Sequence, residues 1–218
     1  LWIRRQRQMC IRDRERGDKE SINIDLISTR AQYEPGSSLK IFSIGLALEQ
    51  GLLNEKTEYY VEDTIELIEN SCQKDFKGYK GCYKDFLKHE PYNLSVKEII
   101  ERSSNVGTII ATKDLNINDL EEFLSKFGFS KRTGIELSGE SKGSFDPNKT
   151  CTTCLSSLSI GYSINVTQMQ MVKAYSIIAN GGKNVDLTLI KAPYSNYSPN
   201  QVIDLSLIHI SEPTRRLS

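Results

Sequence analysis

A single apolar stretch, residues 37–50, places the strongest constraint on how this chain folds, because it reads SSLKIFSIGLALEQ. Pro35 and Gly36 before it and Gly51 after it are typical of a helix start and stop. The apolar side chains between them spread over a broad face of that helix: Leu39, Ile41, Phe42, Ile44, Leu46 and Leu48. A face of this width has to be covered, so the stretch predicts a mostly buried helix.

Further helices are predicted from capping residues and apolar spacing, over residues 95–103, 106–113, 118–128 and 168–179. Ser95 and Glu98 form a capping box, and Asn118 and Thr167 cap two of the other helices. The remaining segments are interpreted as a loop (15–32), a short hairpin strand (57–69), an irregular surface excursion (70–91) and a second loop (133–146). The chain is therefore predicted to be mainly helical, with few strands able to form a sheet.

Composition excludes several classes of protein. The 218 residues hold 28 basic and 28 acidic side chains, 38% hydrophobic residues, 14 Gly and 6 Pro, so a collagen-like or fully disordered chain is excluded. The sequence has no apolar run of about 18 residues, the length that would indicate a membrane span. The lack of net positive charge removes the usual electrostatic argument for a nucleic-acid partner.

Both ends of the chain differ from the rest. Residues 1–14 (LWIRRQRQMCIRDR) and 205–218 (LSLIHISEPTRRLS) continue neither a helical nor a strand period, and we interpret them as translated sequencing-adapter read-through. The rival interpretation, a targeting arm, lacks the apolar core of a signal peptide. Without these ends the chain keeps 21 basic residues (28 − 7) and 26 acidic residues (28 − 2), and His89 is its only histidine.

The first candidate for chemistry is an S-x-x-K motif, formed by Ser37 and Lys40 at the start of the apolar helix. Positions i and i+3 share a helix face, so the Lys40 amine can reach the Ser37 hydroxyl. The helix start favours negative charge on the Ser37 oxygen, and apolar surroundings would lower the pKa of Lys40 toward that of a useful base. The spacing alone is weak evidence, because residues 71–74 (SCQK) match it too and an ordinary N-cap serine explains Ser37 as well.

The second candidate is Ser103-Ser104-Asn105, which lies between two predicted helices. A serine hydroxyl and a nearby amide can relay a proton and hold a substrate carbonyl. Taken alone, the triplet is explained as well by Ser and Asn residues that cap helix ends.

Together, the two motifs and their flanks resemble the first two motifs of penicillin-binding transpeptidases, a superfamily marked by S-x-x-K, S-D-N and K-T-G. The flanks read YEPGSSLK at residues 33–40 and SSNVG at residues 103–107. Residues 159–182 are similar to the segment before the third motif of class B enzymes, and residues 133–140 fit the loop between the motifs. S-S-N-V-G leans toward the cell-division enzymes, away from elongation-type enzymes and β-lactamases.

The resemblance implies a D,D-transpeptidase of septal peptidoglycan synthesis. Ser37 would attack the D-Ala-D-Ala carbonyl of a stem peptide, expel the terminal D-Ala and form an acyl-enzyme. Lys40 would take the Ser37 proton, and Ser103 with Lys40 would pass a proton to the leaving amine. Asn105 would orient the substrate amide. An amine of a neighbouring stem peptide would then accept the acyl group, and β-lactams would acylate the same serine.

The resemblance also implies a fold: the α/β penicillin-binding transpeptidase fold, which is like that of serine β-lactamases. This chain would cover mainly the helical subdomain, with most of the central sheet missing. Residues 15–204 would form a partial transpeptidase domain between the two artefactual ends. Because neither Lys-Thr-Gly nor Lys-Ser-Gly occurs in the chain, we expect the isolated chain to be an incomplete, inactive enzyme.

The resemblance implies no metal or nucleotide cofactor. The partners that it implies are peptidoglycan stem peptides, β-lactams, proteins of the division complex and a lipid-II polymerase, without nucleic acid and with membrane contact only through a missing N-terminal anchor. The expected location is the cell envelope, at the periplasmic or extracytoplasmic face of the cytoplasmic membrane. Two alternatives stay open: a β-lactam sensor domain, which is acylated without turnover, and a non-catalytic scaffold of the division apparatus.

The cysteines allow three interpretations. Cys72 and Cys82 lie in the irregular excursion, and Cys151 and Cys154 form a C-x-x-C. A zinc site built from all four does not match a known paired spacing. In an oxidising compartment one or two disulfides are expected instead, with Cys72–Cys82 pinning the excursion, and unpaired buried thiols are the third interpretation. His89 is predicted to be a surface loop residue.

Overall fold

The computed structural model describes residues 27–54, 56–73, 81–146, 151–190 and 199–203. Residues 1–14 and 205–218, interpreted above as artefacts, lie outside the described residues. The described helices are α2 (Ile27–Arg30), α3 (Lys40–Glu49), α4 (Val96–Glu101), α5 (Asn105–Thr112), α6 (Ile117–Lys126), α7 (Cys154–Ser159) and α8 (Gln168–Ala179). A 3₁₀ turn, η1 (Gly36–Leu39), leads directly into α3.

The strands form three small antiparallel pairs. They join β1 (Glu58–Val61) to β4 (Tyr92–Ser95), β2 (Thr64–Glu66) to β3 (Cys82–Lys84), and β5 (Ser144–Phe145) to β6 (Ile164–Asn165). The prediction of a mainly helical chain with little sheet is thus confirmed for the described residues.

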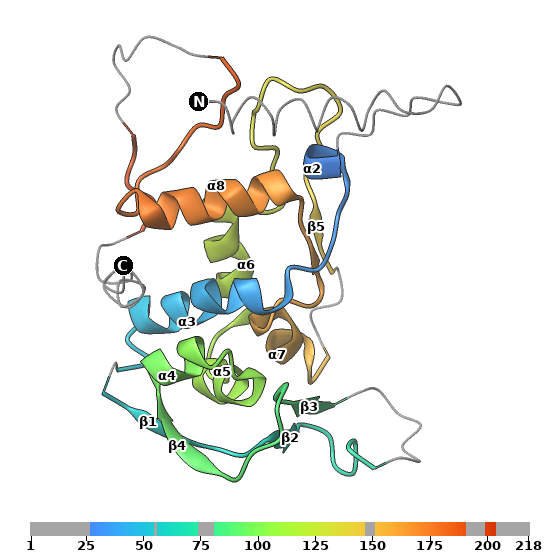
Figure 1. Ribbon diagram of the computed structural model, residues 1–218, viewed down its shortest axis with the longest axis vertical. Coiled ribbons are helices and arrows are strands. Elements are labelled where there is room, and N and C mark those ends of the chain that lie inside the picture. The colour runs from blue at the N-terminus through green and yellow to red at the C-terminus, as the bar shows by residue number, and fades with distance from the viewer. Residues whose placement is uncertain (1–26, 55, 74–80, 147–150, 191–198, 204–218) are drawn as a thin grey trace, which may run out of the picture.

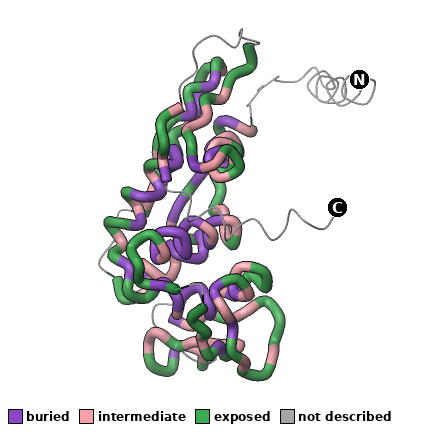
Figure 2. The backbone as a smooth tube through the Cα atoms, turned by 90° about the vertical axis from the view of Figure 1, so that its left-hand side faces the viewer, coloured by how far each residue is buried: buried purple, intermediate pink, exposed green. Residues whose placement is uncertain are grey.

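Helix α3 lies in the middle of the molecule, with α8 on one side and α4 and α5 on the other (Figure 1). It contacts α4, α5, α6 and α7, so its broad apolar face is covered from several directions. Leu39, Ile44 and Ala47 are fully buried, and the burial is concentrated along the central elements (Figure 2). The Phe42 ring meets the Phe127 ring edge-on at 4.8 Å between centroids. The predicted central helix is therefore confirmed, with a 3₁₀ first turn.

Several predicted boundaries hold and others are wrong. Ser95 closes a capping box and Thr167 caps α8, as predicted, and the structure adds a capping box between Thr167 and Gln170. The N-cap of α6 is Asn116 rather than Asn118: the Asn116 side chain accepts a hydrogen bond from the Asn118 amide. Residues 57–69, predicted as one short hairpin strand, contain two strands, β1 and β2, and each pairs with a strand from later in the chain. Helix α7 has no counterpart among the predicted elements.

Two disulfides close short loops in the structure. Cys72 bonds Cys82, as predicted, and Cys151 bonds Cys154. The four thiols are therefore not available to a metal ion, and within the described ranges no group of three or more His, Cys, Asp and Glu residues is placed to hold one. None of the helices that the structure describes has the length and apolar character needed to cross a membrane.

Candidate active site

Ser37 lies in the 3₁₀ turn η1, directly before α3, and is exposed. The Lys40 amide donates to the Ser37 carbonyl, which is the i→i+3 hydrogen bond typical of a 3₁₀ turn, and α3 begins at Lys40. Backbone N–H groups at a helix start have no partner within the helix and carry partial positive charge. The hydroxyl of Ser37 is thus presented to solvent at the end of α3 that favours an anion.

A segment far along the chain holds this turn in place. The Gly36 amide donates to the Gly161 carbonyl at 3.0 Å, and Tyr33 and Val166 exchange two backbone hydrogen bonds. The backbones approach so closely that a Cβ atom on Gly161 would lie 2.0 Å from the Gly36 carbonyl oxygen. The stretch at residues 159–167, singled out in the sequence, therefore packs against the residues around Ser37.

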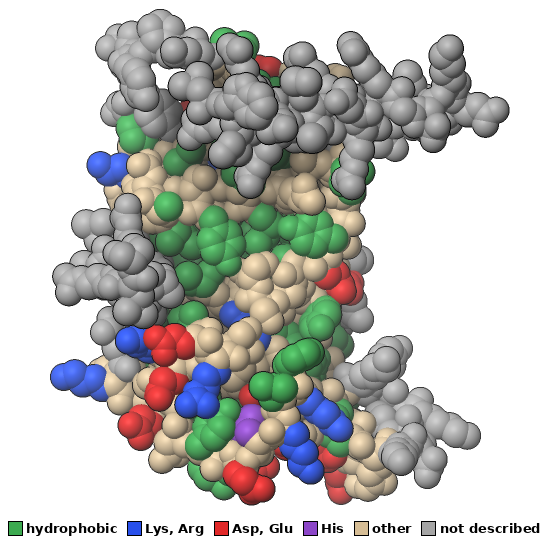
Figure 3. Space-filling view, viewed as in Figure 1, with side chains coloured by type: hydrophobic (Ala, Val, Ile, Leu, Met, Phe, Trp, Pro, Cys, Tyr) green, Lys and Arg blue, Asp and Glu red, His purple; other side chains and the backbone are tan. Residues whose placement is uncertain are grey.

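Helix α8 also contacts the η1 turn. The Tyr175 hydroxyl donates to the Ser38 carbonyl at 2.7 Å, and its ring meets that of Phe42 edge-on. Tyr175 and Val172 are both exposed. Hydrophobic side chains form a band between α8 and α3 on the face shown in Figure 3. Burial raises the pKa of Tyr175, so its hydroxyl keeps the proton that it donates to the Ser38 carbonyl.

Lys40 is the first residue of α3 and is only 2% exposed. Its amine donates to the carbonyl oxygen of Ser103 and to the Ser103 hydroxyl, the latter at 3.2 Å. Burial lowers the pKa of Lys40 to about 8, against the opposing effect of the negative charge of Asp85. A pKa of about 8 leaves part of the Lys40 amine neutral near neutral pH, in line with the lowered pKa expected from the sequence. The hydrogen bonds of the amine go to Ser103, however, rather than to Ser37.

Ser103 stands between α4 and α5 in the left-handed backbone conformation, with φ of 54°. This conformation is costly for a residue with a side chain and is found where the surroundings impose it. The turn reverses the chain so that the carbonyl and the hydroxyl of Ser103 both face the Lys40 amine. The two sequence motifs therefore meet through this pair of residues.

Ser104 and Asn105 begin α5. The Ser104 hydroxyl is the N-cap and accepts from the Gly107 amide at 2.8 Å. The Asn105 side-chain amide donates to the Lys84 carbonyl at 2.7 Å. The Asn105 side chain is therefore hydrogen-bonded to the last residue of β3, and Asn105 itself is the first residue of α5, two residues after Ser103.

Sequence reasoning missed Asp85, whose carboxylate accepts hydrogen bonds from the Asn105 and Val106 amides and from the Ser104 hydroxyl. It also underrated His89. That residue lies in a loop, as predicted, but its side chain is only 15% exposed and its Nε2 lies 3.1 Å from Asp85. Nothing in the local sequence marks either residue, because Asp85 bonds to a helix that begins twenty residues later and His89 acts through Asp85.

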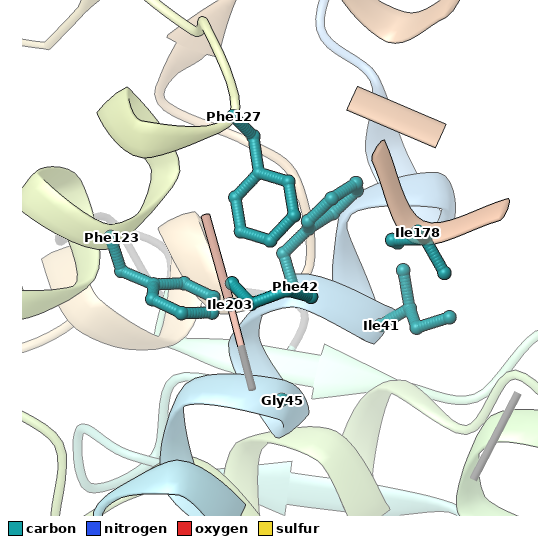
Figure 4. Close-up of a pocket in the computed structure, with 7 residues that line it drawn as sticks. All are labelled: Ile41, Phe42, Gly45, Phe123, Phe127, Ile178 and Ile203. Carbon is teal, nitrogen blue, oxygen red and sulfur yellow. The ribbon is translucent and has the colours of Figure 1, made fainter. Parts of the chain in front are cut away.

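A separate pocket is lined by apolar side chains and one glycine, and none of the motif residues lines it (Figure 4). It lies between α3, α6 and α8 and is lined by Ile41, Phe42, Gly45, Phe123, Phe127, Ile178 and Ile203. None of its lining side chains can act in catalysis, so the candidate site is the cluster of Ser37, Lys40, Ser103 and Asn105.

The chain is similar in sequence to known penicillin-binding proteins. The chain is 30% identical over 166 residues to the penicillin-binding protein PbpB of Mycolicibacterium smegmatis. The aligned region covers 76% of the chain and 24% of that protein. It is also 30% identical over 186 residues to the peptidoglycan D,D-transpeptidase FtsI of Buchnera aphidicola subsp. Schizaphis graminum, covering 83% of the chain and 30% of the relative. The chain thus spans less than a third of the length of these curated relatives.

Solved structures show the same fold. The transpeptidase domain of Burkholderia pseudomallei penicillin-binding protein 3 matches with a TM-score of 0.71 and 20% identity, over 84% of this chain and 52% of that one. Penicillin-binding protein 3 of Mycobacterium tuberculosis, complexed with ampicillin, matches with a TM-score of 0.70 and 26% identity, over 84% and 40%. The predicted penicillin-binding transpeptidase fold, present here in part, is confirmed.

The sequence model described as the penicillin binding protein transpeptidase domain matches residues 11–212, nearly the whole chain. The match includes the S-x-x-K turn, the Ser103–Asn105 turn and the segment that packs against the first of them. With its fold and its motifs in agreement, the chain belongs to the penicillin-binding protein transpeptidase domain family.

Proposed function

We propose that this chain is part of a class B peptidoglycan D,D-transpeptidase that cross-links stem peptides during septal cell-wall synthesis, with Ser37 as its nucleophile. The observation that carries the proposal is the buried Lys40 amine. It joins the S-x-x-K turn to Ser103 and has a pKa of about 8, low enough to accept a proton near neutral pH.

In the first half of the reaction, Ser37 Oγ attacks the carbonyl carbon of the D-Ala-D-Ala bond. Lys40 takes the hydroxyl proton as the C–O bond forms. The positive end of α3 supports the negative charge on the tetrahedral carbonyl oxygen. The C–N bond then breaks, and the proton passes from Lys40 through the Ser103 hydroxyl, 3.2 Å away, to the departing amine of D-Ala.

In the second half, an amine of a neighbouring stem peptide attacks the acyl carbon on Ser37. Its proton returns by the same residues to Ser37 Oγ, which leaves as the C–O bond breaks. Asn105 stands beside this path and is proposed to orient the amide of the stem peptide. A β-lactam would acylate Ser37 by the first half-reaction; the Mycobacterium tuberculosis relative is complexed with ampicillin and with aztreonam.

The 218 residues contain no Lys-Thr-Gly or Lys-Ser-Gly, the motif that in this family faces the nucleophile from a sheet strand. We therefore propose that the chain needs the rest of a longer protein to bind the substrate carboxylate. That protein would act in the cell envelope, on the extracytoplasmic side, with partners in the division complex. Stable, Ser37-dependent acylation of the isolated chain by penicillin would contradict this.

The test uses protein expressed from the intact gene that contains this segment, incubated with a stem pentapeptide and an amine acceptor. We expect release of D-Ala and a cross-linked product, both lost in Ser37→Ala and kept in Ser38→Ala, a neighbouring serine whose hydroxyl donates to the Pro35 carbonyl. Acylation by penicillin without cross-linking would favour the sensor domain, and no acylation would favour the scaffold. Either result would overturn the proposed activity.

A further inference from the structure

Asp85 lies in the loop after β3 and is not part of any motif, yet its carboxylate holds the start of α5. Its Oδ1 accepts from the Asn105 amide and from the Val106 amide, the latter at 3.0 Å. Its Oδ2 accepts from the Ser104 hydroxyl at 2.7 Å. The side chain is only 7% exposed, so these bonds are made largely out of contact with water.

These contacts account for the first-turn donors of the helix. The Ser104 oxygen takes the Gly107 amide, and Asp85 takes the two amides before it. An anion at this end of a helix is stabilised both by the hydrogen bonds and by the helix dipole. The neighbouring Lys84 carbonyl accepts the Asn105 side chain, so one short segment after β3 fixes both the backbone and the side chain of Asn105.

The fixed turn sets what Lys40 can reach. Ser103 directly precedes Ser104, and its carbonyl and hydroxyl are the acceptors for the Lys40 amine. Ser103 is also in the left-handed conformation, which persists only where neighbouring contacts impose it. A carboxylate that anchors residues 104–106 therefore determines where the Ser103 hydroxyl stands relative to Lys40.

His89 supports the carboxylate from the other side. Its Nδ1 lies 2.9 Å from the Glu90 carbonyl, which can only accept, so that nitrogen carries a proton. Its Nε2 lies 3.1 Å from Asp85, and the ring stacks on Tyr92 at 4.3 Å between centroids. Burial opposes protonation, but the bonds to Glu90 and Asp85 outweigh it and raise the pKa of His89. Asp85 is thus held between an imidazole and the α5 start.

We propose that Asp85 is a positioning residue for acyl transfer: its carboxylate fixes the Ser103–Asn105 turn and thereby the contact between the Ser103 hydroxyl and the Lys40 amine. The inference rests on the proposed function, because it assigns Lys40 and Ser103 their proton-transfer roles. A second consequence separates it from a purely structural role. The negative charge of Asp85 raises the pKa of Lys40, so its removal shifts the titration of Lys40 toward lower pH.

The experiment compares Asp85→Asn, Asp85→Glu and a matched control, Asp63→Asn. Asp63 is the acid whose carbonyl accepts from the Asp85 amide, and its side chain makes no hydrogen bond to α5 among the described residues. The second-order rate of acylation by a fluorescent penicillin is measured from pH 6 to pH 10 in protein from the intact gene. Thermal unfolding is recorded for each variant.

For Asp85→Asn we expect about a tenfold lower plateau rate of acylation, which is the effect of losing a charge-assisted hydrogen bond. We also expect the acylation rate to reach its half-maximum at a lower pH than in the wild type. Asp63→Asn removes a charge that acts on His89 but no hydrogen bond to α5, so it should keep the wild-type plateau rate. Asp85→Glu keeps the charge but displaces it, so it should lower the rate while leaving the centre of the pH profile near the wild-type position.

Equal rates and equal midpoints in Asp85→Asn and the wild type would overturn the inference. Unfolding of both Asp85 variants would also overturn it, by showing that the residue is needed for folding alone. If the wild type itself is not acylated at Ser37, the proposed function fails. The inference is then tested by NMR titration of the Lys40 Cε signal in the 218-residue chain, where an unchanged midpoint in Asp85→Asn would contradict it.

Discussion

Lys40 shows most clearly how the surroundings of a single residue change its properties. A lysine at a helix start would ordinarily extend into water, but here it is 2% exposed and points to Ser103. The sequence predicts the lowered pKa, because the apolar neighbours along α3 are visible in it. The partner is not predictable in this way, since the i, i+3 spacing suggests Ser37 and only the folded turn brings Ser103 within reach.

The titration of Lys40 gives a direct prediction. Lys40 serves as a base only when its amine is neutral, and burial lowers its pKa to about 8. The rate of penicillin acylation should therefore rise with pH and be half-maximal near pH 8. Lys40→Arg, which stays protonated, should reduce the rate by about 10²- to 10⁴-fold. A rate that does not change between pH 6 and pH 9, or an active arginine variant, would contradict this role.

At the scale of elements, the residues around Ser37 depend on a contact between two segments that are distant in sequence. The η1 turn lies against residues 161–166, and the contact works because Gly161 has no side chain and adopts φ of +87°. The sequence identified both stretches by resemblance, and the structure supplies the physical reason: a backbone-to-backbone approach that leaves no room for a Cβ atom.

The prediction for this contact compares Gly161→Ala with Gly134→Ala. Both glycines have a similar positive φ, +87° and +85°, but a Cβ atom on Gly134 would meet nothing within 4 Å, whereas one on Gly161 would lie 2.0 Å from the Gly36 carbonyl oxygen. Gly134→Ala should lose about 1–2 kcal/mol of unfolding free energy in a denaturant titration. Gly161→Ala should lose about 2 kcal/mol more and acylate more slowly. Equal losses would show that the contact is unimportant.

Elements were predictable where their signals are local. The capping box at Ser95, the N-cap at Thr167 and the apolar run of α3 can each be recognised from neighbouring residues in the sequence, and all three are confirmed. Helix α7 was missed because its sequence, CLSSLS, is rich in serine and has no N-cap hydrogen bond. The strand pairings were not predicted, because β1 meets β4 across some thirty residues and such long-range register is not visible in one segment.

At the scale of the whole molecule, the three small strand pairs lie at the edges of a helical core rather than at its centre (Figure 1). A helical core with few strands is the arrangement expected of the helical part of a transpeptidase domain. The chain covers 52% of the Burkholderia pseudomallei domain that it matches. The described residues nonetheless bring together three separated stretches of sequence at one place: the S-x-x-K turn, the Ser103–Asn105 turn and residues 161–166.

The central claim is that Ser37 is the residue acylated when this segment works within its complete protein. Protein from the intact gene is incubated with penicillin and digested, and the modified peptide is sequenced by mass spectrometry. We predict one penicilloyl group per molecule, on Ser37, and no modification of Ser37→Ala. A penicilloyl group on any other residue, or full modification of the Ser37→Ala variant, would contradict the account.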